Sequence, residues 1–262
     1  MPISKFCEFA RATGVDGIEI LDAFLYAPGV SRDHLPETAD FEQELSGSLR
    51  DLRVHAIAVT NDFAHSDPDR VRLETDKIGL GVELAERYGA GLVRVFSAHP
   101  EPQDIETSRQ RAIENLQQVD RRGRVLAVEN HGVPFGTPSE VLAISRGAGT
   151  GICFDIGNWL LAGIDPVRAA YELPFPDLIH VKDFIADPAG TYATPVGEKI
   201  SGAFLGDGIV PIKETLTALF SRPDRRPVPI DLELECGEQG REATKEGVKW
   251  LRSLLAQLVS SA

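Results

Sequence analysis

The chain has 262 residues, a length that α/β barrels commonly reach as a single unit. Apolar residues make up 42% and charged residues 26% of the sequence, which is the composition of a globular protein and excludes a disordered one. Because 27 Lys and Arg are outnumbered by 40 Asp and Glu, the formal charge of −13 disfavours nucleic acid and anionic membrane surfaces as partners.

Hydropathy, the N-terminal residues and the cysteines predict a cytoplasmic protein. The longest apolar stretches, such as 54–60 and 254–258, are far shorter than the ~18 residues that a membrane span needs. The first residues show no cationic start followed by an apolar block, so no secretory signal is expected. Cys7, Cys153 and Cys236 form no CxxC pair, which suits a reducing compartment.

Short β-branched runs alternate with longer helical patterns along the whole chain, and no linker separates two halves. This alternation predicts parallel βαβ units within one domain over residues 1–262. Asp67 before Pro68 predicts the start of a helix, and Gly89 predicts its end. The predicted strands, in chain order, are 17–21, 54–60, 92–97, 125–130, 151–155, 178–183 and 229–235.

The signatures of several other α/β classes are absent. No GxGxxG follows the first predicted strand, and the glycines of Gly206-Asp207-Gly208 follow no strand closely. P-loop, zinc-finger and GxSxG patterns do not occur either. Dinucleotide-binding and serine-hydrolase functions are therefore disfavoured.

Four successive predicted strands carry ionisable residues at their C-terminal ends, where a barrel of this type places its active site. These residues are Glu129, Asp155, His180 and Glu233. If the strands are neighbours, three converging carboxylates repel one another unless a cation lies among them. Three oxygen ligands and one nitrogen suit Mn²⁺ first, with Mg²⁺, Co²⁺ or Zn²⁺ as alternatives. Separate structural ion pairs are the competing interpretation.

At these residues the sequence resembles the sugar phosphate isomerase/epimerase family, the xylose isomerase-like TIM barrels. The resemblance implies a TIM (β/α)8-type barrel whose divalent metal is bound by Glu129, Asp155, His180 and Glu233. Glu235 lies on the same side of the last strand as Glu233 and is an alternative ligand, whereas Asp231 lies deeper and is expected to be structural. The matching stretches span nearly the whole chain: GVDGIEI, GAGLVRVFSAH, LAVENHG, GICFDIGNW, LIHVKDF, LGDGIVPIKETL and DLELE.

The resemblance implies a sugar isomerase or epimerase that moves a proton between neighbouring carbons of a ketose or polyol derivative. The metal would stabilise the ene-diolate, and Glu129 and Glu233 would act as the acid/base pair. Asp155 and His180 would mainly hold the metal. No cluster of Arg and Lys for a phosphate is evident, so a free sugar is favoured over a phosphorylated one.

Further polar residues near strand ends are candidates for the same site. Lys182 follows His180 by two residues, and its ammonium could approach substrate oxygens or pair with an acid such as Glu198. His131 follows Glu129 by two residues and is a candidate acid/base, or a residue that supports a ligand. The candidates for substrate binding are Glu19, Arg94, Asn158 and His99, with a barrel ion pair as the alternative for Glu19 and Arg94 and a helix cap for Asn158.

Three other functions compete with this interpretation. Apurinic endonucleases of the same superfamily place a His three residues after the sixth-strand Asp, where this chain has Asn158, and a DxH motif where it has Asp207-Gly208-Ile209. Because this chain lacks those histidines and has a formal charge of −13, DNA repair is disfavoured. A lyase of the same architecture, such as an inosose dehydratase, a dehydroshikimate dehydratase or a C-glycoside deglycosidase, shares the enolate step. A barrel that binds sugar without catalysis is the third.

The N-terminal region predicts an incomplete strand count. GVDGIEI resembles the second strand of the family, and only five residues precede the helix expected at 6–13. We therefore expect seven parallel strands, with a gap or a substituted segment in place of the first.

In the loop 22–36, Phe24, Leu25 and Tyr26 form either an apolar lid over a ligand or ordinary loop packing. Barrels of this kind often pair, so a homodimer is also considered.

Overall fold

The computed structural model describes residues 1–27, 29–97 and 104–260. Its contacts divide the chain into two compact units. The first unit comprises Met1–Val128 and Ile144–Gly151, and the second comprises Glu129–Ala143 and Ile152–Ala262. Helix α5 (Pro138–Ala148) has residues in both.

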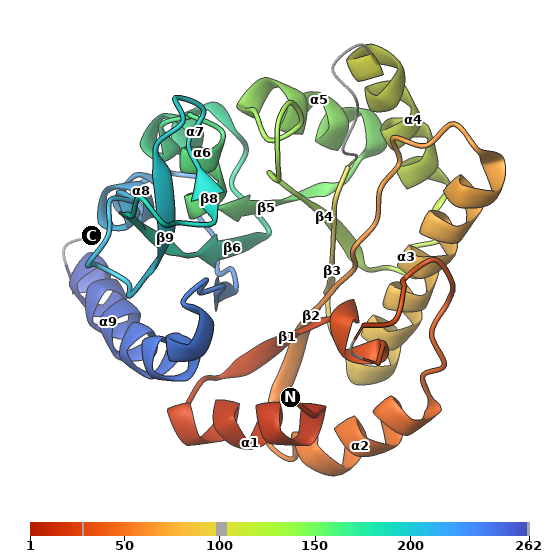
Figure 1. Cartoon of the computed structure of the whole chain (residues 1–262), viewed down its shortest axis with the longest axis horizontal. Helices are drawn as coiled ribbons and strands as arrows, with labels where there is room; N and C mark the ends of the chain where they lie inside the picture. The colour runs from red at the N-terminus through yellow and green to blue at the C-terminus, as the bar shows by residue number, and fades with distance from the viewer. Residues whose placement is uncertain (28, 98–103, 261–262) are drawn as a thin grey trace. The chain divides into compact units, whose positions relative to one another are not determined.

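The first unit alternates helices with parallel strands. Strand β1 pairs with β2, β2 with β3 and β3 with β4, all in parallel, so strands that follow one another in sequence are neighbours. Helices α1 and α2 lie side by side (Figure 1). In chain order the elements are α1 (Ile3–Thr13), β1 (Gly17–Leu21), the 3₁₀ turn η1 (Asp22–Leu25), α2 (Ala39–Leu49), β2 (Arg53–Ala58), α3 (Pro68–Tyr88), β3 (Leu92–Val95), α4 (Ile105–Gln118) and β4 (Val125–Glu129).

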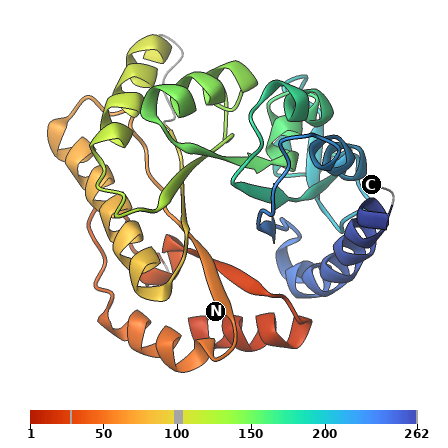
Figure 2. The same ribbon diagram turned by 180° about the vertical axis from the view of Figure 1, so that it is seen from behind.

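Helix α3 shows how local sequence signals fix an element. The Asp67 side chain accepts a hydrogen bond from the Asp69 amide, Pro68 occupies the first turn, and Gly89 ends the helix at φ +73°, as predicted. Figures 1 and 2 show α3 running alongside β2 and β3. A Cβ at Gly81 would lie 2.5 Å from Val59 Cγ2, so the absence of a side chain lets the helix approach the sheet closely.

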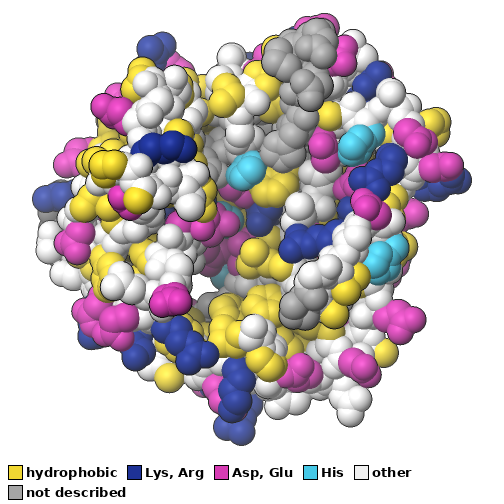
Figure 3. All heavy atoms as spheres, viewed as in Figure 1, with side chains coloured by type: hydrophobic (Ala, Val, Ile, Leu, Met, Phe, Trp, Pro, Cys, Tyr) yellow, Lys and Arg dark blue, Asp and Glu magenta, His cyan; other side chains and the backbone are white. Residues whose placement is uncertain are grey.

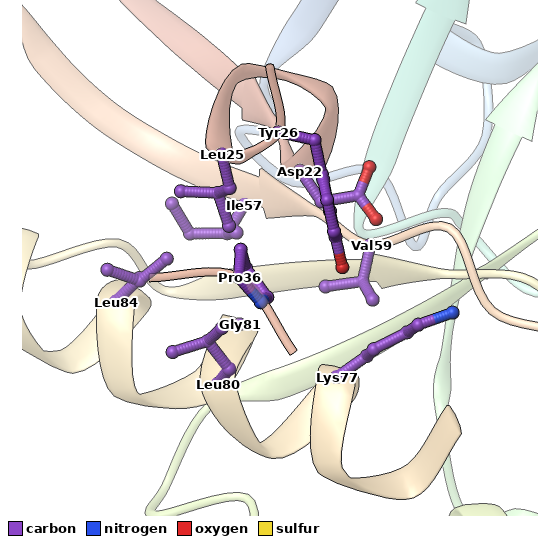
Figure 4. Close-up of a pocket in the computed structure, with 10 residues that line it drawn as sticks. All are labelled: Asp22, Leu25, Tyr26, Pro36, Ile57, Val59, Lys77, Leu80, Gly81 and Leu84. Atoms are coloured by element: carbon purple, nitrogen blue, oxygen red, sulfur yellow. The ribbon is translucent and has the colours of Figure 1, made fainter. Parts of the chain in front are cut away.

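The loop after β1 packs within the first unit. Leu25 and Tyr26 line a pocket between η1, β2 and α3, together with Ile57, Leu80 and Leu84 (Figure 4). This is the loop-packing alternative predicted for these side chains.

The second unit carries the remaining parallel strands and an additional small sheet. Strand β5 pairs with β6 and β6 with β10, in parallel. Strands β7, β9 and β8 form a separate antiparallel sheet in that order, which sequence patterns did not predict. The elements are β5 (Gly151–Asp155), α6 (Ile156–Leu161), α7 (Pro166–Glu172), β6 (Leu178–Val181), β7 (Asp183–Ala186), β8 (Tyr192–Ala193), β9 (Lys199–Ala203), α8 (Ile212–Phe220), β10 (Ile230–Leu232), the 3₁₀ turn η3 (Gly237–Gln239) and α9 (Gly240–Ser260).

A buried aromatic and aliphatic core fixes the positions of β5 and β6. Phe154, Trp159 and Phe184 are almost completely buried, and the rings of Phe154 and Trp159 lie 5.3 Å apart. Side chains alternate between the two faces of a strand, so Phe154 enters this core while its neighbour Asp155 lies on the other face. The core therefore sets the direction in which the polar residues of these strands project.

The described residues contain seven parallel strands, β1 to β6 and β10, alternating with helices, which is the arrangement of a TIM-type barrel. The expected number of seven strands is confirmed. Two predicted strands are shorter than expected. Within the predicted strand 178–183, the barrel strand β6 ends at Val181, because Asp183 already begins β7. Within the predicted strand 229–235, only Ile230–Leu232 forms a strand.

None of the helices in the described ranges has the length and hydropathy of a membrane span.

Figure 3 shows acidic and basic side chains close together over α9. Helix α9 also carries the exposed ion pair of Lys249 Nζ with Glu246 Oε1, at 2.7 Å.

Candidate metal centre

Four side chains of the second unit gather at the ends of four strands. Glu129 is the last residue of β4, Asp155 is the last residue of β5, His180 lies in β6 and Glu233 follows β10. Each offers one ligand atom, and these four atoms lie within 4.8 Å of one another. Glu129, Asp155 and His180 are buried, and Glu233 is half-buried. The structure thus brings the four predicted ligands together, and we call them the four-residue cluster.

The four-residue cluster has the dimensions and chemistry of a divalent-cation site. Ligands on opposite sides of an ion with bonds of about 2.1 Å are separated by about 4.2 Å, which the cluster permits. Three carboxylates and one imidazole are a donor set that suits Mn²⁺ or Mg²⁺. Three acids in so buried a position also require positive charge nearby. The residues present therefore fit the ion implied by the sequence.

Asp155 uses its two carboxylate oxygens differently. Oδ1 accepts a hydrogen bond of 2.7 Å from the Asn158 amide and caps helix α6. Oδ2 lies 2.9 Å from Lys182 Nζ and 3.9 Å from His180 Nδ1. Burial, opposed by the charge of Lys182, raises the pKa of Asp155 to about 7. The helix cap thus orients Oδ2 toward the cluster.

Lys182 is part of this centre. Its Nζ lies 2.9 Å from Asp155 Oδ2 and 2.7 Å from Glu233 Oε2, and the side chain is buried. Burial lowers the pKa of Lys182, but the neighbouring carboxylates outweigh this effect and hold the pKa above its usual value. Gly157 leaves room for the lysine stem, since a Cβ there would lie 2.2 Å from Lys182 Cγ. Lys182 therefore pairs with Asp155 and Glu233, and not with Glu198 as the alternative prediction had it.

Asn158 contacts two members of the cluster. Its Nδ2 donates a hydrogen bond of 2.7 Å to Glu129 Oε1, while its backbone amide donates one of 2.7 Å to Asp155 Oδ1. Asn130, which the sequence did not single out, joins β4 to β5. Its Nδ2 donates to the Asp155 carbonyl at 2.9 Å, and its Oδ1 accepts from the Asp155 amide at 2.7 Å. Asn158 thus orients the Glu129 carboxylate, and Asn130 holds the backbone of Asp155. The prediction that Asn158 caps the helix is wrong, because Asp155 is the N-cap of α6 and Asn158 lies within that helix.

Replacing Asn158 by alanine is expected to weaken Mn²⁺ binding by about 10–100-fold, because Glu129 loses the hydrogen bond that fixes its orientation. The backbone cap on Asp155 remains in this variant, so the change isolates the side chain. Titration calorimetry with Mn²⁺ measures the effect. The control is Glu198→Gln, which neutralises an exposed acid in the same unit. Equal Mn²⁺ affinities in the two variants would contradict this role.

The segment that carries Glu233 is held by the small antiparallel sheet. The Glu233 amide donates a hydrogen bond of 3.1 Å to the Val181 carbonyl, although β10 has already ended. A Cβ at Gly202 would lie 2.3 Å from the Glu235 carbonyl oxygen, so β9 packs directly on this backbone. Glu233 therefore continues the hydrogen bonding to β6, and the backbone at Glu235 packs against Gly202 of β9.

Glu233 and Glu235, the two alternative ligands, have different surroundings. Only Glu233 belongs to the group of four ligand atoms found in the described residues. Glu235 is exposed and accepts a hydrogen bond from the Tyr192 hydroxyl. Burial and this carboxylate raise the pKa of Tyr192 to about 12. The structure thus favours Glu233 as the ligand.

Asp183 explains the glycine-rich run that follows β9. Its carboxylate accepts hydrogen bonds from the backbone amides of Gly206, Gly208 and Val210, at 2.9, 3.0 and 3.1 Å. A Cβ at Gly208 would lie 2.1 Å from Asp183 Oδ1. The amides of this run thus bind an internal carboxylate, which accounts for the glycines without a nucleotide phosphate.

The remaining candidates do not belong to the group of four ligand atoms. His131 is half-buried two residues beyond Glu129, and its acid/base role stays a prediction. Glu19 and Arg94 belong to the first unit, where Glu19 Oε1 and Arg94 Nε are 4.0 Å apart, as in the predicted ion pair. Asp231 Oδ2 lies 4.0 Å from His180 Nε2, consistent with a structural partner. His99 lies outside the described residues.

Comparison with solved structures shows the same fold at low sequence identity. A xylose isomerase-like TIM barrel protein from Mycobacterium smegmatis, in complex with magnesium, is 17% identical with a TM-score of 0.73, covering 98% of this chain and 89% of that one. A D-tagatose 3-epimerase-like protein is 17% identical with a TM-score of 0.73, covering 97% and 93%. The probable 3-DHS dehydratase AsbF from Bacillus anthracis is 18% identical with a TM-score of 0.68, covering 96% and 94%.

The comparison with curated proteins returns no match. A family model, by contrast, extends over both units of the chain. The model described as xylose isomerase-like TIM barrel matches residues 7–254. The parallel strands, the alternating helices and this match lead to one conclusion: the chain belongs to the xylose isomerase-like TIM barrel family.

Proposed function

We propose that the protein is a divalent-metal-dependent isomerase or epimerase of a ketose or polyol derivative. The observation that carries this proposal is the four-residue cluster, in which three carboxylates and one imidazole offer ligand atoms within 4.8 Å of one another. The similar fold of a D-tagatose 3-epimerase-like protein supports the same class of reaction. Mn²⁺ is the ion we propose first, since its preference for oxygen and imidazole ligands matches the donor set.

A bound divalent ion would polarise the carbonyl and adjacent hydroxyl of the substrate and stabilise the ene-diolate. The residues of the chain would supply orientation and proton transfer. Because Asn158 holds Oε1 of Glu129, we propose that the other oxygen, Oε2, would remove or return the proton. Glu233, the residue that follows β10, would exchange the second proton, and Lys182 beside it would stabilise negative charge on substrate oxygens.

A lyase is the second candidate, and Lys182 is the observation that favours it. The first step is the same, namely removal of a proton next to a carbonyl. A lyase then expels a neighbouring hydroxide, which leaves as water after taking up a proton. The Lys182 ammonium, 2.7 Å from Glu233 Oε2, would stabilise the negative charge on the departing oxygen, while the glutamate that took up the proton in the first step returns it. The similar fold of a probable 3-DHS dehydratase supports this alternative.

Metal removal and deuterium exchange test the proposal together. The protein is stripped with a chelator, reloaded with Mn²⁺, Mg²⁺ or Co²⁺, and incubated in D₂O with free and phosphorylated ketoses. We expect no exchange without metal and restored exchange with Mn²⁺, more with free than with phosphorylated sugars.

The product distinguishes the candidates. Deuterium at the carbon next to the carbonyl, without loss of water, indicates an isomerase or epimerase, whereas an unsaturated product indicates a lyase. Binding of sugar without exchange under every metal condition would contradict both and favour a binding protein without catalysis.

The setting that we propose is a reducing cytoplasm with a small-molecule substrate. The free cysteines of the described residues support the first part, and the charge of −13 disfavours nucleic acid.

A further inference from the structure

Cys153 lies directly beneath the four-residue cluster on strand β5. It precedes Asp155 by two residues, so the two side chains lie on the same face of the strand. Cys153 is completely buried. Its Sγ and one ligand atom from each of Glu129 and His180 lie within 4.8 Å of one another. A thiol is therefore within ligand distance of two residues that also belong to the four-residue cluster.

We propose that Cys153, Glu129 and His180 form a second metal site, selective for thiophilic divalent ions such as Zn²⁺ and Cd²⁺. This site shares Glu129 and His180 with the four-residue cluster, so we expect an ion at one site to take two ligands from the other. The inference rests on the proposed function only through those shared ligands. Its consequence is that a thiophilic ion displaces Mn²⁺ and stops the proposed reaction.

The donor set has the composition of a zinc site. One thiolate, one imidazole and one carboxylate give three protein ligands and leave a fourth position to water. Tetrahedral ligands at typical zinc distances are about 3.5 Å apart, which the 4.8 Å limit allows. Sulfur favours soft ions, whereas Mn²⁺ and Mg²⁺ prefer oxygen. On binding, the thiol loses its proton to solvent and no electron is transferred.

The contacts of Lys182 favour the thiol site for a soft ion. Lys182 Nζ is bonded to both Asp155 and Glu233, at 2.9 and 2.7 Å. An ion on Cys153, Glu129 and His180 leaves these two ion pairs intact. An ion on the four-residue cluster instead competes with Lys182 for the same carboxylates. The two sites thus differ in two respects. Only one contains sulfur, and only the four-residue cluster competes with Lys182 for its carboxylates.

Cadmium titration tests the proposal, because a cadmium thiolate has an ultraviolet charge-transfer band that does not depend on activity. We expect the band in the natural protein and its loss in Cys153→Ser and Cys153→Ala. Cadmium affinity should fall by more than about 100-fold, since a direct ligand is lost where changes around a ligand already cost 10–100-fold. The matched controls are Cys236→Ser, in the same unit, and Cys7→Ser, in the other. Both controls should keep the band.

Electron paramagnetic resonance of Mn²⁺ supplies the second readout. Cadmium should release bound Mn²⁺ from the natural protein and the controls at far lower concentration than from Cys153→Ala, which should still bind Mn²⁺ and thereby report its own folding. A band that persists without Cys153, or that depends on Cys236, would overturn the proposal. So would Cd²⁺ and Mn²⁺ bound together. A cadmium band in a protein that never binds Mn²⁺ would instead leave this site standing and refute the proposed function.

Discussion

Replacing Lys182 by methionine is expected to destabilise the metal-free protein by about 3–5 kcal/mol, the cost typical of removing one partner from a buried ion pair. Asp155 is fully buried and would lose the ammonium 2.9 Å away, while the partly exposed Glu233 would retain some solvation. Methionine keeps most of the stem that fills the space over Gly157, so the loss is chiefly electrostatic. Urea denaturation in the presence of a chelator measures the effect.

The loss of unfolding free energy caused by Lys182→Met should grow with pH. Burial places the folded-state pKa of Asp155 at about 7, above its ordinary value, and Lys182 opposes this shift. A carboxyl with a raised folded-state pKa favours folding while protonated and opposes it once ionised, so stability is lost as the pH rises through that value. Without Lys182 the pKa rises further. The deficit should therefore be larger at about pH 8 than at about pH 6.

Mn²⁺ and a distant lysine provide the controls for this variant. A divalent ion supplies positive charge to the same carboxylates, so Mn²⁺ should stabilise Lys182→Met more than it stabilises the natural protein. Lys213→Met, on the exposed side of α8, should leave stability nearly unchanged. A Lys182→Met protein as stable as Lys213→Met at every pH would show that Lys182 does not neutralise the centre.

Replacing Glu129 by glutamine is expected to lower the rate of substrate deuterium exchange by about 10²–10⁴-fold, the usual contribution of a positioned acid or base. Glutamine has nearly the same shape and can still accept the Asn158 hydrogen bond through Oε1, so the fold should be preserved. What disappears is the capacity of Oε2 to take up a proton. Nuclear magnetic resonance of Mn²⁺-loaded protein with a ketose in D₂O follows the exchange.

Two comparisons separate this loss from weaker metal binding. Exchange is measured at saturating Mn²⁺, with occupancy checked by elemental analysis, so that the rate refers to loaded protein. Glu198→Gln, the exposed acid used as a control above, should exchange at the natural rate. A loaded Glu129→Gln protein that retains the natural rate would remove Glu129 from the acid/base pair.

Local sequence patterns predicted the elements that depend on neighbouring residues. The helix signals at Asp67 and Gly89 and the strand at Gly17–Leu21 appear in the structure with the predicted bounds. Sequence patterns failed where a contact joins distant residues. Strands β7, β8 and β9 were missed because they are short and because their pairing depends on hydrogen bonds across a loop. The predicted strand 229–235 was too long, and the backbone at Glu235, near its predicted end, packs against Gly202 of β9.

The same division holds for the candidate centre. Ionisable residues at the ends of apolar runs mark Glu129, Asp155, His180 and Glu233, because few buried positions tolerate a charge unless the fold needs it. Sequence alone left Glu233 and Glu235 as alternatives, since both lie on the same side of an extended chain. The structure separates them, with Glu233 in the cluster and Glu235 bonded to Tyr192.

The sequence by itself determined the alternation of strands and helices, the seven parallel strands and the residues that carry charge into the strand ends. Those features follow from hydrophobic periodicity and from the high cost of burying ions. Only the tertiary structure decided that Lys182 bridges Asp155 and Glu233, that Asn158 orients Glu129 and that Cys153 lies within reach of two cluster ligands. These contacts depend on distances between strands far apart in the chain, which no local pattern specifies.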